Sequence, residues 1–103
     1  MDKQFIVGAV ARIVLTVSNP AGPLMDPSAL RFKFIRPDFV QVNHVLGAPE
    51  SGIVRDGLGR YHIDIPLPLV GNWYWRWETG PVPVGVSEGS IAVMPSRFTL
   101  ETQ

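Results

Sequence analysis

Hydrophobic and polar residues alternate along much of this 103-residue chain. The three tryptophans occupy every second position of one segment: Trp73, Trp75 and Trp77. A period of two residues places their rings on one face of a β-strand and excludes a single face of a helix. The residues between and after them face the other way: Tyr74, Arg76 and Glu78. Three large rings on one side of a strand predict a second layer against which they pack.

Short alternating or apolar runs predict the remaining strands, and glycine and proline separate them. Ten Gly and ten Pro residues interrupt the chain so often that a helix of average length has no place. The predicted strands cover residues 4–7, 10–18, 30–36, 39–46, 53–54, 59–65, 72–79 and 84–93. Within this set, segment 39–46 is irregular and typical of an edge strand, and the last strand is interrupted at Gly89. Strands and turns at this spacing are typical of a β-sandwich or barrel.

The same alternation divides each strand into an inner and an outer face. In segment 59–65 it places Tyr61 inward and places His62 and Asp64 outward, together with Arg60. The aromatic residues that we expect in the core are Trp73, Trp75, Trp77, Tyr61, Phe32 and Phe34.

Gly71 resembles the corner that precedes the sixth strand of immunoglobulin-like domains, because an aromatic residue, Trp73, follows it by two positions. Trp75 then stands where antibody domains have a core cysteine. We therefore expect Trp73 and Trp75 to anchor the core, and Trp77 to be less completely buried near the end of the sandwich. The predicted fold is an all-β, immunoglobulin-like β-sandwich of seven to eight antiparallel strands.

The composition narrows the class of protein. A chain of 103 residues is enough for a single domain, with short extended arms at about residues 1–3 and 95–103. Nine basic residues balance nine acidic ones, so no long-range field attracts nucleic acid or an anionic membrane. The chain has no cysteine, and its first residues lack the apolar core of a signal peptide. These features predict synthesis in a reducing cytoplasm without a signal for export.

Residues able to carry chemistry are few. The two histidines are His44 and His62, and His62 lies two positions from Asp64. Such a pair can be half of a metal site or a base with its orienting carboxylate. Neither a third ligand nor a nucleophile accompanies the pair, so we interpret both histidines as surface polar groups. We expect no enzymatic activity, no catalytic residue, no metal and no cofactor.

A binding surface remains the alternative to chemistry. The outward residues that we group as a candidate interface are Tyr74, Arg76, Glu78, His62 and Asp64. Aromatic and arginine side chains are enriched in interfaces between proteins. The same residues can instead form cross-strand pairs, Arg76 with Asp64 or Glu78 with Arg60.

Four short motifs of the sequence resemble, in their order, those of a known protein family. They are Val54-Arg-Asp-Gly-x-Gly-Arg-Tyr61, Gly71-x-Trp-x-x-Arg-Trp-Glu78 and Glu88-Gly-Ser-x-x-Val93, with Asp26-Pro-Ser earlier in the chain. Their order resembles small immunoglobulin-like structural proteins of tailed bacteriophages and prophages, over about residues 4–96. The motifs consist of turn and core residues and carry no catalytic residue.

The resemblance implies a virion protein. We expect a capsid decoration, cement or head accessory protein that binds a repeating protein surface, with other capsid or tail proteins as partners. The alternatives are a tail or baseplate adaptor, and a module that binds a glycan or another cell-surface ligand through Tyr74 and Arg76. The terminal segments 1–7 and 95–103 are candidate arms that can add a strand to a neighbouring protein or lie along it. A homo-oligomer formed on assembly is a further partner that we consider.

Overall fold

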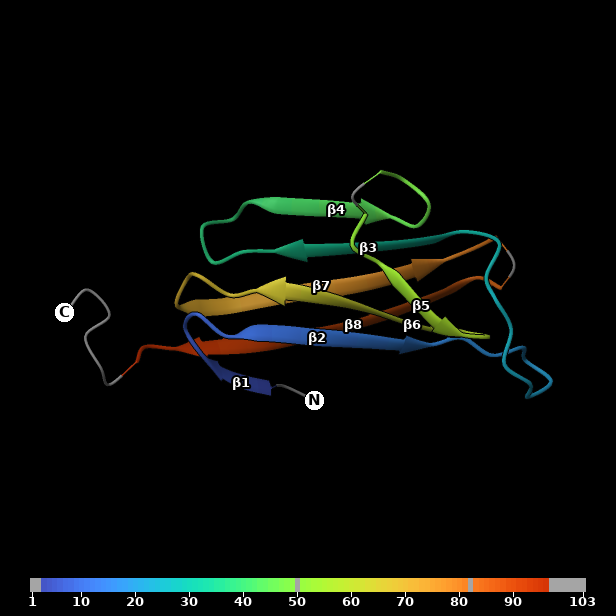
Figure 1. Cartoon of the computed structure of the whole chain (residues 1–103), viewed down its shortest axis with the longest axis horizontal. Coiled ribbons are helices and arrows are strands. Elements are labelled where there is room, and N and C mark those ends of the chain that lie inside the picture. Colours follow the sequence, from blue (N-terminus) through green and yellow to red (C-terminus); the bar gives the residue numbers. More distant parts are fainter. Residues whose placement is uncertain (1–2, 50, 82, 97–103) are drawn as a thin grey trace.

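Eight β-strands form the regular structure of the computed structural model, which describes residues 3–49, 51–81 and 83–96 (Figure 1). Their bounds are β1 Lys3–Ile6, β2 Val10–Thr16, β3 Leu30–Ile35, β4 Gln41–Val45, β5 Val54–Gly57, β6 Arg60–Pro66, β7 Gly71–Thr79 and β8 Gly85–Met94. The described residues contain no helix. The predicted all-β class is therefore confirmed.

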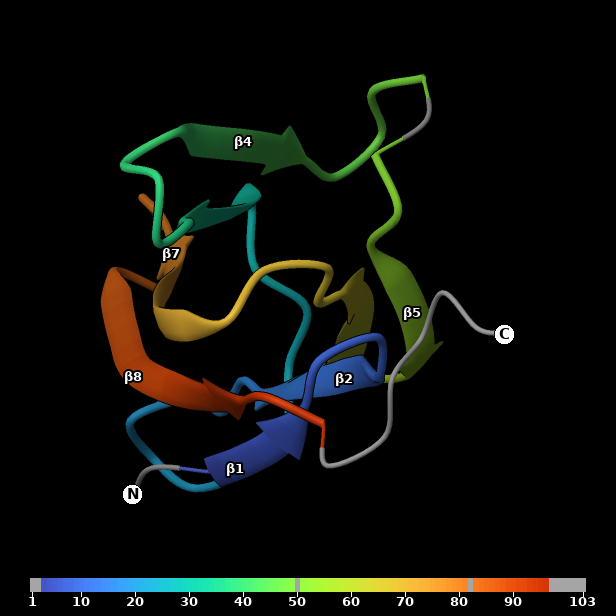
Figure 2. The same ribbon diagram turned by 90° about the vertical axis from the view of Figure 1, so that its left-hand side faces the viewer.

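The strands form two sheets that face each other, as Figure 2 shows along the strands. One sheet has five strands in the order β1-β8-β7-β3-β4, and the other has three in the order β2-β6-β5. This is an immunoglobulin-like sandwich, in which β3–β4, β5–β6 and β7–β8 are pairs within one sheet and the other connections cross between the two sheets. One expectation is wrong: β1 pairs with β8 in parallel, while every other ladder between the eight strands is antiparallel. The segment expected as an N-terminal arm thus includes a paired strand, whereas residues 1–2 and 97–103 lie outside the described part.

Aromatic rings fill the space between the sheets. Phe32 and Trp77 stand opposite each other on β3 and β7, with ring centroids 4.7 Å apart. Phe34 stands opposite Trp75 in the ladder but packs against Trp73, with ring centroids 5.7 Å apart. Tyr61 is buried in the facing sheet. Five of the six expected core aromatics are therefore buried, and the sixth is Trp75.

Trp75 and Trp77 exchange the roles expected for them. Trp77 is 1% exposed and Trp75 is only partly buried at the margin of the core. The reason is in β8, where Gly89 stands opposite Trp75 and leaves room for its indole ring. Strand β8 also continues through Gly89 without the expected interruption.

The corner at Gly71 is present. Gly71 has a φ of +133°, and a Cβ built there would lie 2.8 Å from the Pro37 side chain in the β3–β4 turn. Both observations favour glycine at this position. The crossover from β6 to β7 is fixed further by the Trp73 indole, which donates a hydrogen bond to the Leu69 carbonyl at 3.1 Å.

The connections divide between the two ends of the sandwich (Figure 1). The β1–β2, β3–β4 and β6–β7 connections lie at one end, together with the end of β8. The β2–β3, β5–β6 and β7–β8 connections lie at the other. The described residues contain no helix of the length and apolarity needed to span a bilayer.

Candidate functional site

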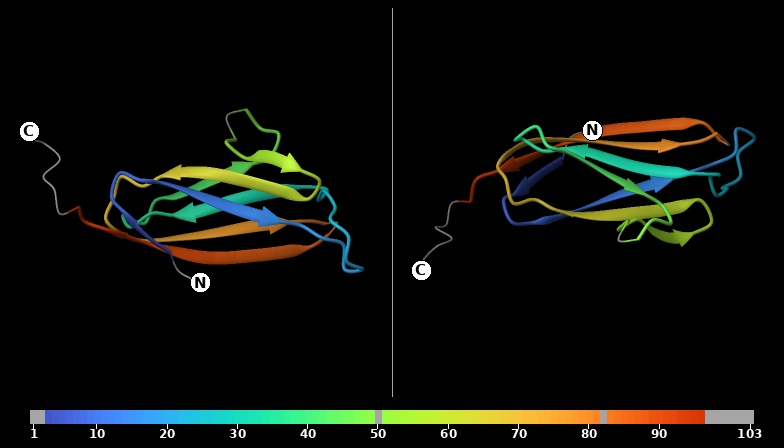
Figure 3. Two further views of the ribbon diagram at one scale, coloured as in Figure 1. Left: turned by 60° about the horizontal axis from the view of Figure 1, so that its bottom comes forward. Right: turned by 90° about the horizontal axis from the view of Figure 1, so that it is seen from above.

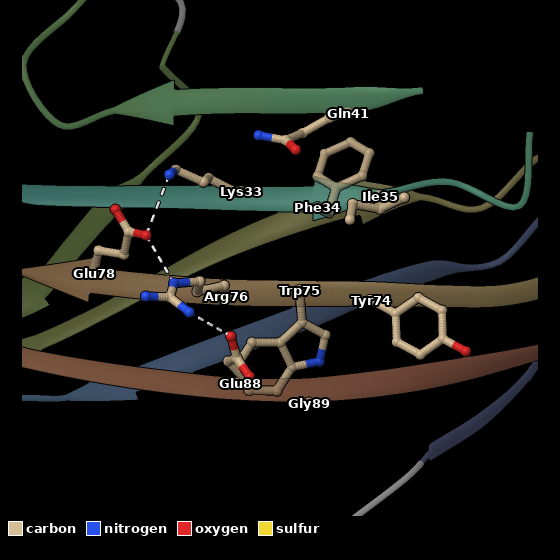
Figure 4. A pocket seen from close by; sticks show the side chains of 10 residues that line it. All are labelled: Lys33, Phe34, Ile35, Gln41, Tyr74, Trp75, Arg76, Glu78, Glu88 and Gly89. Atoms are coloured by element: carbon tan, nitrogen blue, oxygen red, sulfur yellow. Dashed lines mark hydrogen bonds and ion pairs between the residues drawn. The ribbon is translucent and has the colours of Figure 1, made fainter. Parts of the chain in front are cut away.

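The outer face of the five-stranded sheet carries Tyr74, Arg76 and Glu78 on β7. They border a shallow groove of about 470 Å³ (Figure 4). Its lining residues come from four neighbouring strands: Lys33, Phe34, Ile35, Gln41, Tyr74, Trp75, Arg76, Glu78, Glu88 and Gly89. The Tyr74 ring is half exposed and lies apart from the charged residues.

A network of ion pairs spans β3, β7 and β8 at this groove. Lys33 and Arg76 stand directly opposite each other in the sheet, a like-charge pair that by itself is unfavourable. Glu78 offsets the repulsion, since its Oε2 lies 3.2 Å from Lys33 Nζ and 2.7 Å from Arg76 Nε. Arg76 also reaches Glu88 with an Nη1–Oε2 distance of 2.6 Å.

The pKa values follow from this network. The hydrogen bond from Lys33, and then that from Arg76, hold the pKa of the Glu78 carboxyl below its usual range. The carboxylates of Glu88 and Glu78 raise the pKa of Arg76. Both shifts favour the charged forms of Glu78 and Arg76, which suits these two groups to fixing the sheet and orienting a ligand rather than to transferring protons at neutral pH.

His62 and Asp64 do not join this surface. They lie on β6 in the three-stranded sheet, so they are separated from Tyr74, Arg76 and Glu78 by the whole thickness of the sandwich. The expected pairs Arg76–Asp64 and Glu78–Arg60 are also wrong, because β6 and β7 belong to different sheets. Asp64 instead accepts two hydrogen bonds from Arg12 on β2, at 2.8 and 3.0 Å. This bidentate pair lowers the pKa of Asp64 and raises that of Arg12.

His62 faces away from the core, as alternation predicts, but it is only 8% exposed. Its Nδ1 lies 2.9 and 2.7 Å from the two carboxylate oxygens of Asp56. The pairing of β5 with β6 shifts register between Arg55 and Gly57, so Asp56 is the bulged residue. A bulge re-aims a side chain, and here the Asp56 carboxylate reaches the histidine ring. The expected exposed His62 is therefore a buried, paired one.

His44 also differs from the surface polar group that we expected. It stands on β4 opposite Phe32 and is partly buried. Its ring stacks on Phe34, with centroids 5.9 Å apart and planes inclined by 22°. Among the described residues, no group of three or more His, Cys, Asp or Glu side chains is placed to hold a metal ion.

A carboxylate that alternation did not single out organises the opposite end of the three-stranded sheet. Asp26 accepts two hydrogen bonds from Arg55, at 3.2 and 2.9 Å. It also accepts a hydrogen bond from the Gly59 amide at 3.0 Å and one from the Tyr61 hydroxyl at 2.8 Å. These hydrogen bonds, with Arg55 the largest cause, lower the pKa of Asp26 to about 2. Asp26 thus does more than the turn role expected of an aspartate before proline.

The feature most relevant to binding was missed by the sequence reasoning. Five exposed apolar side chains lie along the end of the five-stranded sheet that carries the β3–β4 turn, and we name them the apolar rim: Ile6, Phe39, Val40, Val70 and Met94. An exposed apolar set at one end of a small domain is a common mark of an interaction site.

The members of the apolar rim come from both sides of the five-stranded sheet. Ile6 and Met94 are partners in the β1–β8 ladder. Val70 immediately precedes Gly71, whose backbone packs against Pro37 of the turn that carries the remaining two members. Four strand spacings separate the two sides of the sheet, a width of roughly 19 Å.

Phe39 dominates the rim. Its side chain is 90% exposed, and its φ is +66°, the left-handed conformation that a bulky L-residue rarely adopts. The turn enforces that conformation: the Phe39 amide donates to the Arg36 carbonyl at 2.9 Å, and the Arg36 amide donates to the Val40 carbonyl at 2.9 Å. Arg36 and Asp38 form an ion pair across the turn, at 3.0 Å. A phenylalanine therefore occupies a position suited to glycine and points its ring into solvent.

No known protein-family model matches the chain, and no curated protein matches its sequence.

Proposed function

We propose that this protein is a non-enzymatic structural protein of a tailed-phage virion, which attaches to a repeating protein surface through the apolar rim. The capsid shell is the surface that we favour, in the manner of a decoration or head accessory protein. A position in the tail or baseplate is compatible with the same binding mode.

The observation that carries the binding role is Phe39. Its backbone strain costs free energy in the isolated protein, and its ring gains no burial there. Strain of this kind is concentrated at functional positions. A protruding, rigid aromatic ring is also the type of side chain that supplies most of the binding energy in protein interfaces.

The character of the rim supports a protein partner. Its five members are apolar, and the chain as a whole has no net charge. An anionic membrane or a nucleic acid would be bound most readily by clustered basic residues. The sequence resemblance described above supports the placement in a virion, and the rim supports the proposal of a protein partner without favouring a particular particle.

Co-sedimentation with particles tests the role of the rim. The particles are purified from the strain that carries the gene, and the purified protein is added to particles stripped of it. Replacing Phe39 by glycine removes the ring and relieves the turn, so folding is kept while affinity should fall by about thirtyfold or more. Val84→Gly is the matched control, because Val84 is an exposed apolar residue at the other end of the sandwich. Equal affinity of Phe39→Gly and the wild type for the particles would show that the apolar rim is not part of the interface.

The groove beside Tyr74 favours a second candidate, a glycan-binding module. The groove combines the half-exposed Tyr74 ring at one end with the Gln41 amide and several ordered charges elsewhere in its lining, which offers both stacking and hydrogen bonding to a sugar. Titration with glycans, followed by NMR shifts of the groove residues, tests this role. Chemical-shift changes that a glycan causes in the wild type but not in Tyr74→Ala would favour the glycan-binding role. An absence of chemical-shift changes over a broad set of glycans would exclude that role.

A further inference from the structure

A cleft of about 500 Å³ opens between the two sheets, and we name it the β2–β8 cleft. It is lined by residues 15–18, at and after the end of β2, by residues 85–87 at the start of β8, and by Trp77 of β7. It lies at the end of the sandwich opposite the apolar rim. Because neighbouring residues of a strand point to opposite faces, a lining of consecutive residues indicates that strand edges border the cleft.

The β2–β8 cleft forms because the inward row of β8 begins with small residues. Gly85 and Ser87 stand on the core side of this strand, and Ser87 lies opposite the buried Trp77 in the ladder with β7. Further along the same row, Ile91 and Val93 are large and buried. Ser87 is exposed although it faces inward, so the start of β8 leaves a space beside Trp77 that no side chain of this strand fills.

Trp77 also carries an unpaired polar group. Its side chain is 1% exposed, and its Nε1 is buried with no hydrogen-bond partner in the described part of the chain. The indole nitrogen of Trp73, by contrast, donates to the Leu69 carbonyl. Buried donors are nearly always paired in folded proteins. A lining residue with an unpaired donor therefore points to an acceptor that a ligand brings into the cleft.

The edge of β8 beside the cleft also offers backbone groups. The ladder with β1 covers residues 91–94 of β8, and β1 lies beside this later part of the strand (Figure 3, left). The Val7 amide donates to the Met94 carbonyl, so the even-numbered residues of β8 direct their amides and carbonyls away from β7. At the start of β8 these residues are Val86 and Glu88, and no strand of the described chain pairs with them on that side.

We infer that the β2–β8 cleft binds an extended peptide segment of a partner protein, which adds to β8 at Val86 and Glu88. In this mode of recognition, backbone hydrogen bonds give affinity and a pocket selects alternate side chains. The described residues that line the cleft are all uncharged, so a charged inward side chain would lose its hydration without gaining a counter-ion. The segment is therefore uncharged at alternate positions, and a hydroxyl among these inward side chains accepts the hydrogen bond of Trp77 Nε1.

The inference is independent of the proposed function. Phe39 and the apolar rim lie at the other end of the sandwich, so Phe39→Gly should bind a peptide in the cleft with the affinity of the wild type. Particle binding tests the rim and peptide binding tests the cleft, so the failure of one proposal leaves the other standing.

Three capped heptapeptides serve as probes. The first is acetyl-Lys-Val-Ser-Thr-Ser-Val-Lys-amide, whose inward row is Val, Thr and Val. It reads the same in both directions, so it tests parallel and antiparallel addition together. The second has valine in place of the central threonine, which keeps the shape and removes the hydroxyl. The third has aspartate at all three inward positions.

Two variants of the protein block the site in different ways. Val86→Pro removes an amide that points away from β7, a position where an edge strand tolerates proline. Ser87→Leu fills the cleft, and urea unfolding checks that it is as stable as the wild type. Val14→Pro is the matched control, because the amide of this exposed β2 residue points away from β6, as the Val17 bond to Gly59 shows. Val86→Pro and Ser87→Leu should each weaken binding of the first peptide by about tenfold or more.

Proton–nitrogen correlation NMR at up to millimolar peptide gives the readout. The first peptide should shift the Trp77 indole resonance and slow exchange of the Val86 and Glu88 amides, while the Trp73 indole stays in place. The second peptide should bind roughly two- to tenfold more weakly, and the third should not bind.

The inference is overturned if the first peptide leaves the Trp77 indole resonance unchanged or if the aspartate peptide binds equally well. A shift of the indole without protection of the Val86 amide would mean that the ligand is not an added strand. Loss of binding in Val14→Pro but not in Val86→Pro would place the peptide on β2 and contradict addition to β8. Equal affinity of the first and second peptides would contradict the hydrogen bond to Trp77.

Discussion

Phe39 shows how a single residue can combine a cost for folding with a use in binding. Its left-handed backbone conformation costs roughly 1–2 kcal/mol for a residue with a side chain. The fully solvated ring gives back no burial within the described chain. Replacement by glycine removes the backbone strain but adds about 0.5–1 kcal/mol of conformational entropy cost.

We therefore predict that Phe39→Gly is as stable as the wild type or more stable, by up to about 1 kcal/mol. Urea unfolding at neutral pH measures the difference. Phe39→Ala is the control, because it removes the ring and keeps the strained conformation, so its stability should stay within about 0.5 kcal/mol of the wild type. A clear loss of stability in both variants would mean that the ring packs in the folded protein.

Asp26 gives the fold a defined response to acid. Its pKa falls from the ordinary value of 3.8 to about 2 because the folded state donates hydrogen bonds from Arg55, Gly59 and Tyr61. A depressed folded pKa means that the contribution to stability is complete above pH 4 and is lost as the pH falls through about 2. The unfolded chain binds the proton first, so acid favours unfolding.

We predict that Asp26→Asn is less stable than the wild type at pH 6 and that the difference narrows between pH 4 and pH 2. Urea unfolding of both proteins across this range gives the comparison. A difference that stays constant with pH would show that the carboxylate charge is not what stabilises the fold.

Among the elements, β8 is shaped by its partner β7. Gly89 accommodates the Trp75 ring, and a Cβ at this position would overlap the indole. We predict that Gly89→Ala destabilises the fold by about 1–3 kcal/mol, the usual cost of overpacking. Gly57→Ala is the matched control, because a Cβ there meets no atom within 4 Å and the backbone has no positive φ. Thermal unfolding compares the two, and equal stabilities would contradict the packing of Trp75 on Gly89.

The alternation of apolar and polar residues predicts which residues of a strand share a face. It was sufficient to predict the strands and most of the buried aromatic residues. It does not state which strands share a sheet. Tyr74 and Asp64 both face outward, but the crossover after β6 places them on opposite sides of the sandwich. His62 is covered by Asp56 because of a bulge, and a bulge depends on the pairing of two strands rather than on the period of one.

The apolar rim lay beyond sequence reasoning for a similar reason. Pro37 and Asp38 indicate a turn, but the residue that takes the left-handed conformation depends on the length of the loop and on the pairing of the flanking strands. Ile6, Met94 and Phe39 lie along the same end of the sheet only through the order β1-β8-β7-β3-β4. A signal did exist in the sequence, since an aromatic residue directly after a Pro-Asp turn occupies a position where glycine is common.

The molecule as a whole has three distinct surfaces, and each lies on a different part of the sandwich. The apolar rim lies at one end, the charged groove lies on the five-stranded face, and the β2–β8 cleft lies at the other end. A neutral domain with three distinct surfaces of this kind is suited to an assembly, where a subunit contacts more than one protein at once. We propose that this protein belongs to a virion.

Quantitative mass spectrometry of purified phage particles tests that claim most directly. The particles come from the strain that carries the gene and are purified through a density gradient. We predict that the protein migrates with the particles at many copies per particle, in a constant ratio to the major structural protein across the gradient. Its absence from the particle fractions, with the protein present in the lysate, would contradict the account.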